Sequence, residues 1–155
     1  PTGYYLKFIL AILNSKLIFT WLFHRGKRKG AMLELYQEPL SQIPIIKNVN
    51  IEVQNTIIIL IDYIIYLKKL EKENYIIEFF ERVIDIAVYE LYFKEELHSK
   101  GFGILEVLES ELIPFDNSFE TIDKVYKKLS DKNHKVAYNV NFIDTLDIVK
   151  TIENK

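Results

Sequence analysis

A cluster of cationic side chains near the start of the sequence has the clearest capacity for chemistry. Arg25, Lys27, Arg28 and Lys29 lie within five residues, with no acid among them and with a glycine on either side of the lysine–arginine run. Cations of this density attract phosphates, and glycine lets the backbone approach a ligand closely. We predict that this basic loop, residues 24–30, contacts phosphates of a nucleic acid; the alternative is a solvated surface loop.

Other residues in the same part of the chain could take part in DNA binding. Lys16 is a further candidate for a phosphate contact. Tyr36, Gln37 and Gln42 have the hydrogen-bonding groups needed to contact base edges, although Gln42 is equally compatible with a turn. Phosphate contacts position a protein on DNA, whereas base contacts determine sequence specificity.

The charge distribution supports the same interpretation. Residues 1–50 contain seven basic and two acidic side chains, a net charge of +5, whereas residues 51–155 contain 13 basic and 20 acidic side chains, a net charge of −7. The total of −2 therefore hides a positive first third, which could face an anion, and an acidic remainder, which is solvated or faces a partner.

No set of residues indicates catalysis or metal binding. The chain has no cysteine, its histidines lack zinc-site spacing, and no phosphate-binding or dinucleotide-binding glycine pattern is present. We predict no catalytic residue, no metal site and no cofactor within this sequence. The acids Asp85, Glu90, Glu95 and Glu96 are expected on solvated helix surfaces, and His134 is expected to cap the helix that follows it.

The pattern of apolar residues predicts a mainly α protein. The hydrophobic content is 49% over 155 residues, enough for one domain or a domain and a half. We expect a helical bundle with a long antiparallel helix hairpin over residues 51–93, which Asn50 caps, and a small extended or β excursion near residues 31–46. Residues 43–46 are predicted as a short edge strand, because proline cannot donate to a central ladder.

Residues 4–23 are strongly apolar but contain Lys7 and the polar residues 14–16. We interpret them as one buried helix rather than a membrane anchor. We divide the chain into residues 1–50, with the basic loop, and a helical domain of residues 51–155, although the two can pack as one unit. The start at Pro1 and the single methionine indicate a piece of a longer polypeptide.

Three stretches together resemble the C-terminal target-recognition region of adenine-specific DNA methyltransferases from type I and type IIG restriction–modification systems. The first runs from Tyr5 to Leu17, with its Leu-Asn-Ser turn, and is followed after the basic loop by the Leu-x-x-Ile-Pro-Ile segment of residues 40–45. The second, Asp85 to Phe93, is similar to the Asp-x-x-Val-Tyr-Glu-Leu-Tyr helix of the TaqI-like C-terminal specificity domains. The third, Lys128 to Asp144, resembles the extreme C-terminus of the same polypeptides.

The resemblance implies a parent enzyme that transfers a methyl group from S-adenosylmethionine to adenine N6, in some members with a fused endonuclease. The family's Asn-Pro-Pro-Tyr methylation motif is absent here, so the implied role is to hold and position DNA beside an upstream methyltransferase domain. The implied partners are double-stranded DNA and that domain, in the cytoplasm and without a membrane. Most of the β-rich part of a recognition domain would lie upstream of Pro1.

A different class of function also fits the sequence. The acidic part could form a helical protein–protein interaction or dimerisation module that makes no direct contact with DNA. The aromatic residues within residues 75–93 would then lie at an interface, although a place in the core is the commoner explanation.

Overall fold

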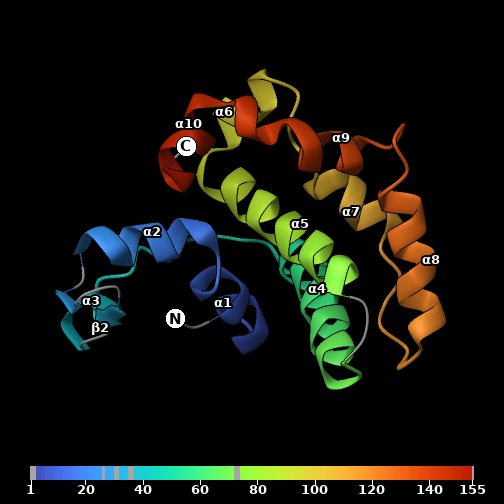
Figure 1. The fold of residues 1–155 in the computed structure, drawn as a ribbon, viewed down its shortest axis with the longest axis horizontal. Coiled ribbons are helices and arrows are strands. Elements are labelled where there is room, and N and C mark those ends of the chain that lie inside the picture. Colours follow the sequence, from blue (N-terminus) through green and yellow to red (C-terminus); the bar gives the residue numbers. More distant parts are fainter. Residues whose placement is uncertain (1–2, 26, 30–31, 35–36, 72–73, 155) are drawn as a thin grey trace.

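The computed structural model is mainly helical, as the sequence predicts. It describes the chain except residues 1–2, 26, 30–31, 35–36, 72–73 and 155, and it describes no side chains within residues 26–38. Helix α5 (Asn74–Tyr92) runs through the middle of the molecule with α4 (Ile51–Lys69) behind it. On one side lie α1 (Leu6–Leu13) and α2 (Lys16–Arg25), and on the other lie α7 (Leu105–Glu111), α8 (Phe119–Leu129) and α9 (Lys135–Phe142) (Figure 1).

The two central helices are the longest of the described elements. Helix α4 spans Ile51–Lys69 and α5 spans Asn74–Tyr92, and they pack against each other where the sequence predicts the hairpin. The Asn50 side chain accepts a hydrogen bond from the backbone N–H of Val53, so the predicted N-cap of α4 is confirmed. Apolar side chains at helical spacing fill the space between the helices, among them the fully buried Ile57, Leu60, Leu67, Ile76, Phe80 and Val83.

The apolar segment near the N-terminus is not the single helix predicted for residues 4–23. It forms α1, Leu6–Leu13, and α2, Lys16–Arg25, which are bent by 62° relative to each other. The buried Ser15 lies at the break, where its hydroxyl donates to the carbonyl of Ile12 and accepts from the N–H of Ile18. The polar residues 14–16 therefore end one helix and begin another.

After α2 the chain forms a small hairpin and then an irregular segment. Strands β1, Lys27–Lys29, and β2, Met32–Glu34, pair antiparallel, and the short α3, Gln37–Ser41, follows. The edge strand predicted for residues 43–46 is wrong, because these residues pair with no strand. Tyrosine hydroxyls satisfy the backbone instead: Tyr92 donates to the carbonyl of Pro44 at 2.7 Å and accepts from the N–H of Ile46 at 3.1 Å.

Shorter helices form the rest of the chain. They are α6, Lys94–Ser99; α7, Leu105–Glu111; α8, Phe119–Leu129; α9, Lys135–Phe142; the 3-10 turn η1, Ile143–Thr145; and α10, Asp147–Glu153. His134 caps α9, because its Nδ1 accepts a hydrogen bond from the N–H of Val136 at 3.1 Å, as predicted. Its Nε2 lies 2.5 Å from Glu111.

Aromatic side chains of α5 lie mostly in the core rather than at a free surface. Phe80 and Tyr89 are fully buried, and Phe79 packs against Tyr126 of α8 with ring centroids 5.2 Å apart. Tyr75, at the start of α5, is 55% exposed but also contacts the Tyr126 ring.

Among the helices that the structure describes, none is by itself both long and apolar enough to cross a membrane. The bent pair α1 and α2 meets that standard of length and composition when the two are taken together.

Candidate functional site

The segment predicted as a basic loop is not a loop at its start, because its first two residues, His24 and Arg25, form the C-terminal end of α2. Arg25 is the last residue of that helix and is exposed, with its guanidinium carbon 5.7 Å from the centre of the Trp21 ring. The backbone of Lys27, Arg28 and Lys29 forms β1, but their side chains lie outside the described part of the chain. Of the four cations, the structure therefore describes the side chain of Arg25 alone.

The predicted base-contacting residues follow the hairpin. Gln37 begins α3, and its side chain lies outside the described residues, as does all of Tyr36. Gln42 is exposed just after α3, where its N–H donates to the carbonyl of Pro39 at 3.2 Å. A turn at Gln42, the alternative interpretation, agrees with this backbone geometry.

Lys16 does not lie beside the basic loop. It begins α2, whereas Arg25 ends the same ten-residue helix, so their backbones are about 14 Å apart along the helix axis. The ammonium of Lys16 lies 4.0 Å from Glu153, and its backbone N–H donates to Asp85 at 2.9 Å. Lys16 therefore helps to hold α2 in place.

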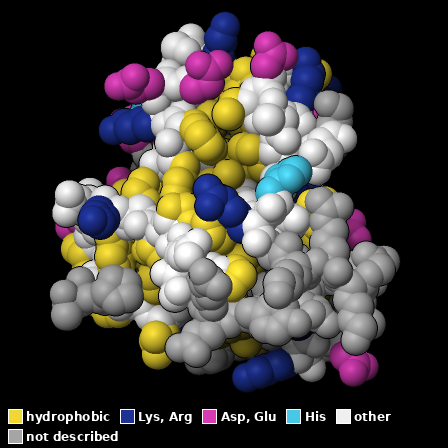
Figure 2. Space-filling view, turned by 90° about the vertical axis from the view of Figure 1, so that its left-hand side faces the viewer, with side chains coloured by type: hydrophobic (Ala, Val, Ile, Leu, Met, Phe, Trp, Pro, Cys, Tyr) yellow, Lys and Arg dark blue, Asp and Glu magenta, His cyan; other side chains and the backbone are white. Residues whose placement is uncertain are grey.

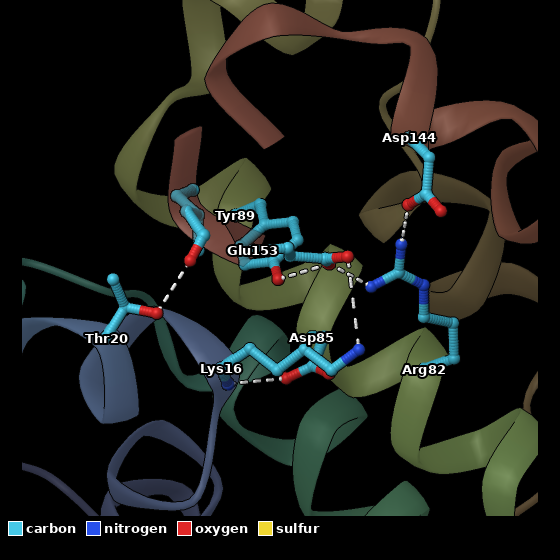
Figure 3. A network of polar contacts seen from close by, with 8 residues as sticks. Lys16, Thr20, Arg82, Asp85, Tyr89, Asp144 and Glu153 are labelled. Carbon is cyan, nitrogen blue, oxygen red and sulfur yellow. Dashed lines mark hydrogen bonds and ion pairs between the residues drawn. The ribbon is translucent and has the colours of Figure 1, made fainter. Parts of the chain in front are cut away.

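A polar network joins α5 to the C-terminal residues (Figure 3). Arg82 of α5 forms ion pairs with Glu153 of α10 and with Asp144 of η1. The Glu153 carboxylate also accepts a hydrogen bond from the hydroxyl of Tyr89 at 2.8 Å. The Glu153 side chain is 2% exposed, so this carboxylate is stabilised by hydrogen bonds inside the protein rather than by water.

A further hydrogen bond connects α2 to the same C-terminal helix. The hydroxyl of Thr20 donates to the carbonyl of Ile152 at 2.7 Å. Helix α2 is therefore fixed at its first residue by Asp85 and at its middle by Thr20, and its far end carries the basic loop.

Burial raises the pKa of two side chains in this region. Desolvation raises the pKa of Asp85 from its ordinary 3.8 to about 6, against the opposing effects of the Lys16 N–H and the charges of Lys16 and Arg82. Desolvation, and then the negative charge of Asp85 and the contact with Glu153, raise the pKa of Tyr89, so its phenol stays neutral. The structure therefore keeps a carboxyl group where ionisation is unfavourable, a property that is more frequent at functional sites.

Two of the acids expected on solvated surfaces are buried. Asp85 and Glu90 are 7% and 5% exposed, whereas Glu95 and Glu96 are exposed as predicted. Asp85 is buried where its carboxylate accepts a hydrogen bond from the N–H of Lys16, the first residue of α2. Glu90 is buried because its carboxylate accepts hydrogen bonds from two backbone N–H groups at the start of α7, 2.6 and 2.9 Å away, and contacts His98 at 2.6 Å.

An open groove of about 430 Å³ lies between α1, α4 and α5. Its walls are mainly apolar, and Asp85 and Lys16 line it together with the ion pair of Lys68 and Glu81. The groove is formed by residues that lie far apart in the sequence, so local sequence patterns do not predict it. The apolar residues that line it are Leu10, Ala11, Ile61, Ile64, Ile65 and Ile84.

Within the part of the chain that the structure describes, no group of three or more histidine, cysteine, aspartate or glutamate side chains could hold a metal ion. No family model, no curated protein and no solved structure matches this chain.

Proposed function

We propose that this chain is the non-catalytic C-terminal specificity and support region of a restriction–modification adenine DNA methyltransferase. In this proposal the basic loop contacts the phosphates of double-stranded DNA in the cytoplasm. An upstream domain of the same polypeptide binds S-adenosylmethionine and carries out the methylation, in some relatives beside a fused endonuclease. The finer architecture that goes with this proposal is a long antiparallel hairpin supporting a small extended excursion that carries the DNA contacts.

The concentration of cations in residues 25–29 is the observation that carries the proposal. Arg25 ends α2 and the other three cations follow it, and this helix is fixed to the body of the protein through Asp85 and Thr20, so the four cations are attached to a supported element. The adjoining residues 1–24 contain Lys7 and Lys16 and no acid. Such a surface is favourable for a phosphate backbone.

Contacts between the stretches that resemble the family give separate support. The Leu-Asn-Ser turn of the first stretch leads into Lys16, whose N–H donates to Asp85, the first residue of the second stretch. Pro44, in the Ile-Pro-Ile segment, accepts a hydrogen bond from Tyr92 of the second stretch. The third stretch contains Asp144, which pairs with Arg82 on the helix of the second. Residues that contact one another are expected to occur together in one fold, which is consistent with a common origin for the three stretches.

The test is a fluorescence-anisotropy titration of a labelled DNA duplex at 50 and 200 mM salt. Four phosphate contacts predict a slope of about −3.6 in log affinity against log salt, hence a loss of about 150-fold between the two concentrations. The variant with Arg25→Glu, Lys27→Glu, Arg28→Glu and Lys29→Glu should bind far more weakly and with a flatter salt dependence.

A matched control separates local contacts from overall charge. Lys69, Lys100, Lys124 and Lys132 are exposed and lie in the acidic part of the chain, and their reversal to glutamate changes the net charge equally. The control variant should keep most of the duplex affinity and the original salt slope. Equal binding by the wild type and the loop variant would remove the basic loop from the DNA-contacting role.

A second candidate function is a helical interaction module, and one face of α1 favours it. Leu6, Leu10 and Leu13 are 88%, 43% and 39% exposed, and their spacing places them along one side of the helix. Figure 2 also shows hydrophobic side chains gathered across the middle of the face that it presents. Light scattering over a range of protein concentrations tests self-association through such surfaces, and a mass that stays monomeric throughout argues against it.

A further inference from the structure

The groove between α1, α4 and α5 has the construction of a small-molecule site. Helix α1 packs against α4, and residues of α1, α4 and α5 line the groove. Ile61, Ile64 and Ile84 line it and keep 8%, 7% and 6% of their surface exposed, whereas core residues of the same helices are fully buried. Its volume of about 430 Å³ lies in the range of ligand pockets.

Polar groups line the groove beside the apolar ones. The ammonium of Lys68 lies 2.7 Å from the carboxylate of Glu81, so these charges neutralise each other. Asp85 lies one helical turn after Glu81 on α5 and lines the groove as a carboxyl group that is more than nine-tenths buried. A ligand in the groove would therefore meet apolar walls and an acidic group.

The Asp85 carboxylate has capacity for a further hydrogen-bond donor. Within the described part of the chain it accepts one hydrogen bond, from the backbone N–H of Lys16. The side chains of the nearby cations pair with other groups, since Arg82 pairs with Glu153 and Asp144 and the Lys16 ammonium lies 4.0 Å from Glu153, although the charges of both favour the ionised form of Asp85. A carboxylate with several acceptor positions and one backbone donor is under-used for a buried group.

We propose that this groove binds a small amphipathic amine, with the apolar body of the ligand against the isoleucines and its ammonium group on the Asp85 carboxylate. The ammonium supplies hydrogen-bond donors that, within the described part of the chain, the side chains of Lys16 and Arg82 do not give to Asp85, and its charge adds to theirs in favouring the ionised carboxylate. Burial raises the pKa of Asp85 to about 6, and a bound cation would favour its ionised form, which agrees with the proposal. Binding of an amine does not require the chain to bind DNA, so this proposal goes beyond the proposed function.

The probe for the test is 2-naphthylmethylamine, titrated into the full chain by isothermal calorimetry at pH 7.5. The neutral 2-naphthylmethanol and the anionic 2-naphthylacetate have the same aromatic body and serve as comparison ligands. We expect saturable binding of the amine at least tenfold tighter than that of the alcohol, and no binding of the acetate. A carboxylate that binds best would overturn the proposal, because Lys16 would then determine the selectivity.

Three variants connect the affinity to the groove. Asp85→Asn keeps an oxygen acceptor for the Lys16 N–H and should reduce the amine's affinity to that of the alcohol. Ile65→Trp, at the wall of the groove, should block both ligands while leaving the carboxylate in place. Asp123→Asn removes an acid from α8, where it pairs with Lys127 outside the groove, and should change nothing.

The remaining outcomes overturn the proposal. They are no saturable binding of the amine, equal affinity for amine and alcohol, and full amine binding by a folded Asp85→Asn variant, with folding checked by circular dichroism. If Asp85→Asn does not fold, the amine–alcohol comparison and Ile65→Trp still decide. Duplex binding is measured separately, so a failure here is distinguishable from a failure of the proposed function.

Discussion

Removing the charge of Asp85 should stabilise the protein at neutral pH. Its side chain is 7% exposed, and desolvation raises its pKa from 3.8 to about 6. That rise corresponds to a cost of about 3 kcal/mol for keeping the group ionised in the folded state. Asp85→Asn retains an acceptor for the Lys16 N–H, so we expect a gain approaching about 3 kcal/mol in the free energy of unfolding at pH 7.5.

The pH dependence gives this prediction its sign. Between about pH 4 and pH 6 the folded protein holds the Asp85 proton more tightly than the unfolded chain, so stability falls as the pH rises through this window. The cost of ionisation is absent below about pH 4 and complete above about pH 7. The difference between Asp85→Asn and the wild type should therefore be close to zero in acid and grow towards neutral pH.

Urea denaturation followed by circular dichroism, at intervals between pH 4 and pH 8, measures this difference. The control is Asp123→Asn, which removes an exposed pair with Lys127 and should change stability by less than about 0.5 kcal/mol. A flat difference, or an Asp85→Asn variant that is less stable at pH 7.5, would show that the contacts with Lys16 outweigh desolvation and would refute the reasoning.

Two further substitutions test contacts that hold the fold together. Glu90→Ala leaves two buried N–H groups at the start of α7 without an acceptor and should lower the free energy of unfolding, measured by urea denaturation, by about 3–5 kcal/mol. The control Glu109→Ala, at an exposed position, should change it by less than about 0.5 kcal/mol. A small effect at Glu90 would mean that water replaces the carboxylate. Tyr92→Phe removes the hydroxyl that forms hydrogen bonds with the backbone of Pro44 and Ile46. It should lower the free energy of unfolding by about 1–2 kcal/mol and speed hydrogen exchange at the Ile46 amide, whereas Tyr138→Phe should do neither. Unchanged exchange at Ile46 would contradict the role given to Tyr92.

The sequence predicts the local features of this fold well. Apolar spacing of 3.6 residues indicates α4 and α5, and a short polar side chain before the apolar run identifies Asn50 as a cap. The cap by His134 was also predicted, from its place before a helical segment. Each of these features depends on residues within a few positions of one another.

The features that the sequence does not reveal depend on distant contacts. Sequence reasoning places Asp85 and Glu90 on the surface because carboxylates on helices are usually solvated. The backbone N–H groups that donate to these two carboxylates lie 69 residues away from Asp85 and 14–15 residues away from Glu90. One signal was available: both acids lie within an almost continuously apolar stretch, residues 83–91, where every helix face is buried. The edge strand at residues 43–46 failed for the same reason, since Tyr92 replaced a strand as its hydrogen-bond partner.

The candidate DNA-binding residues are a different case. Cation density and charge asymmetry are properties of composition, so the basic loop could be identified without a structure. Lys16 was grouped with that loop by its charge alone, and only the direction of α2 shows that it lies at the opposite end of the helix. The DNA contacts of the loop remain a prediction for the anisotropy titration.

The hydrogen bond between Thr20 and the carbonyl of Ile152 spans 132 residues and sets an order of events during synthesis. At the usual rate of roughly 5–20 residues per second, the partner of Thr20 is made about 7–26 s after Thr20 itself. During that interval α2 lacks α10, and the buried Ile18 and Leu22 lack part of their final surroundings. The nascent chain therefore exposes apolar side chains of α2 for seconds, and we expect chaperones to bind there during translation.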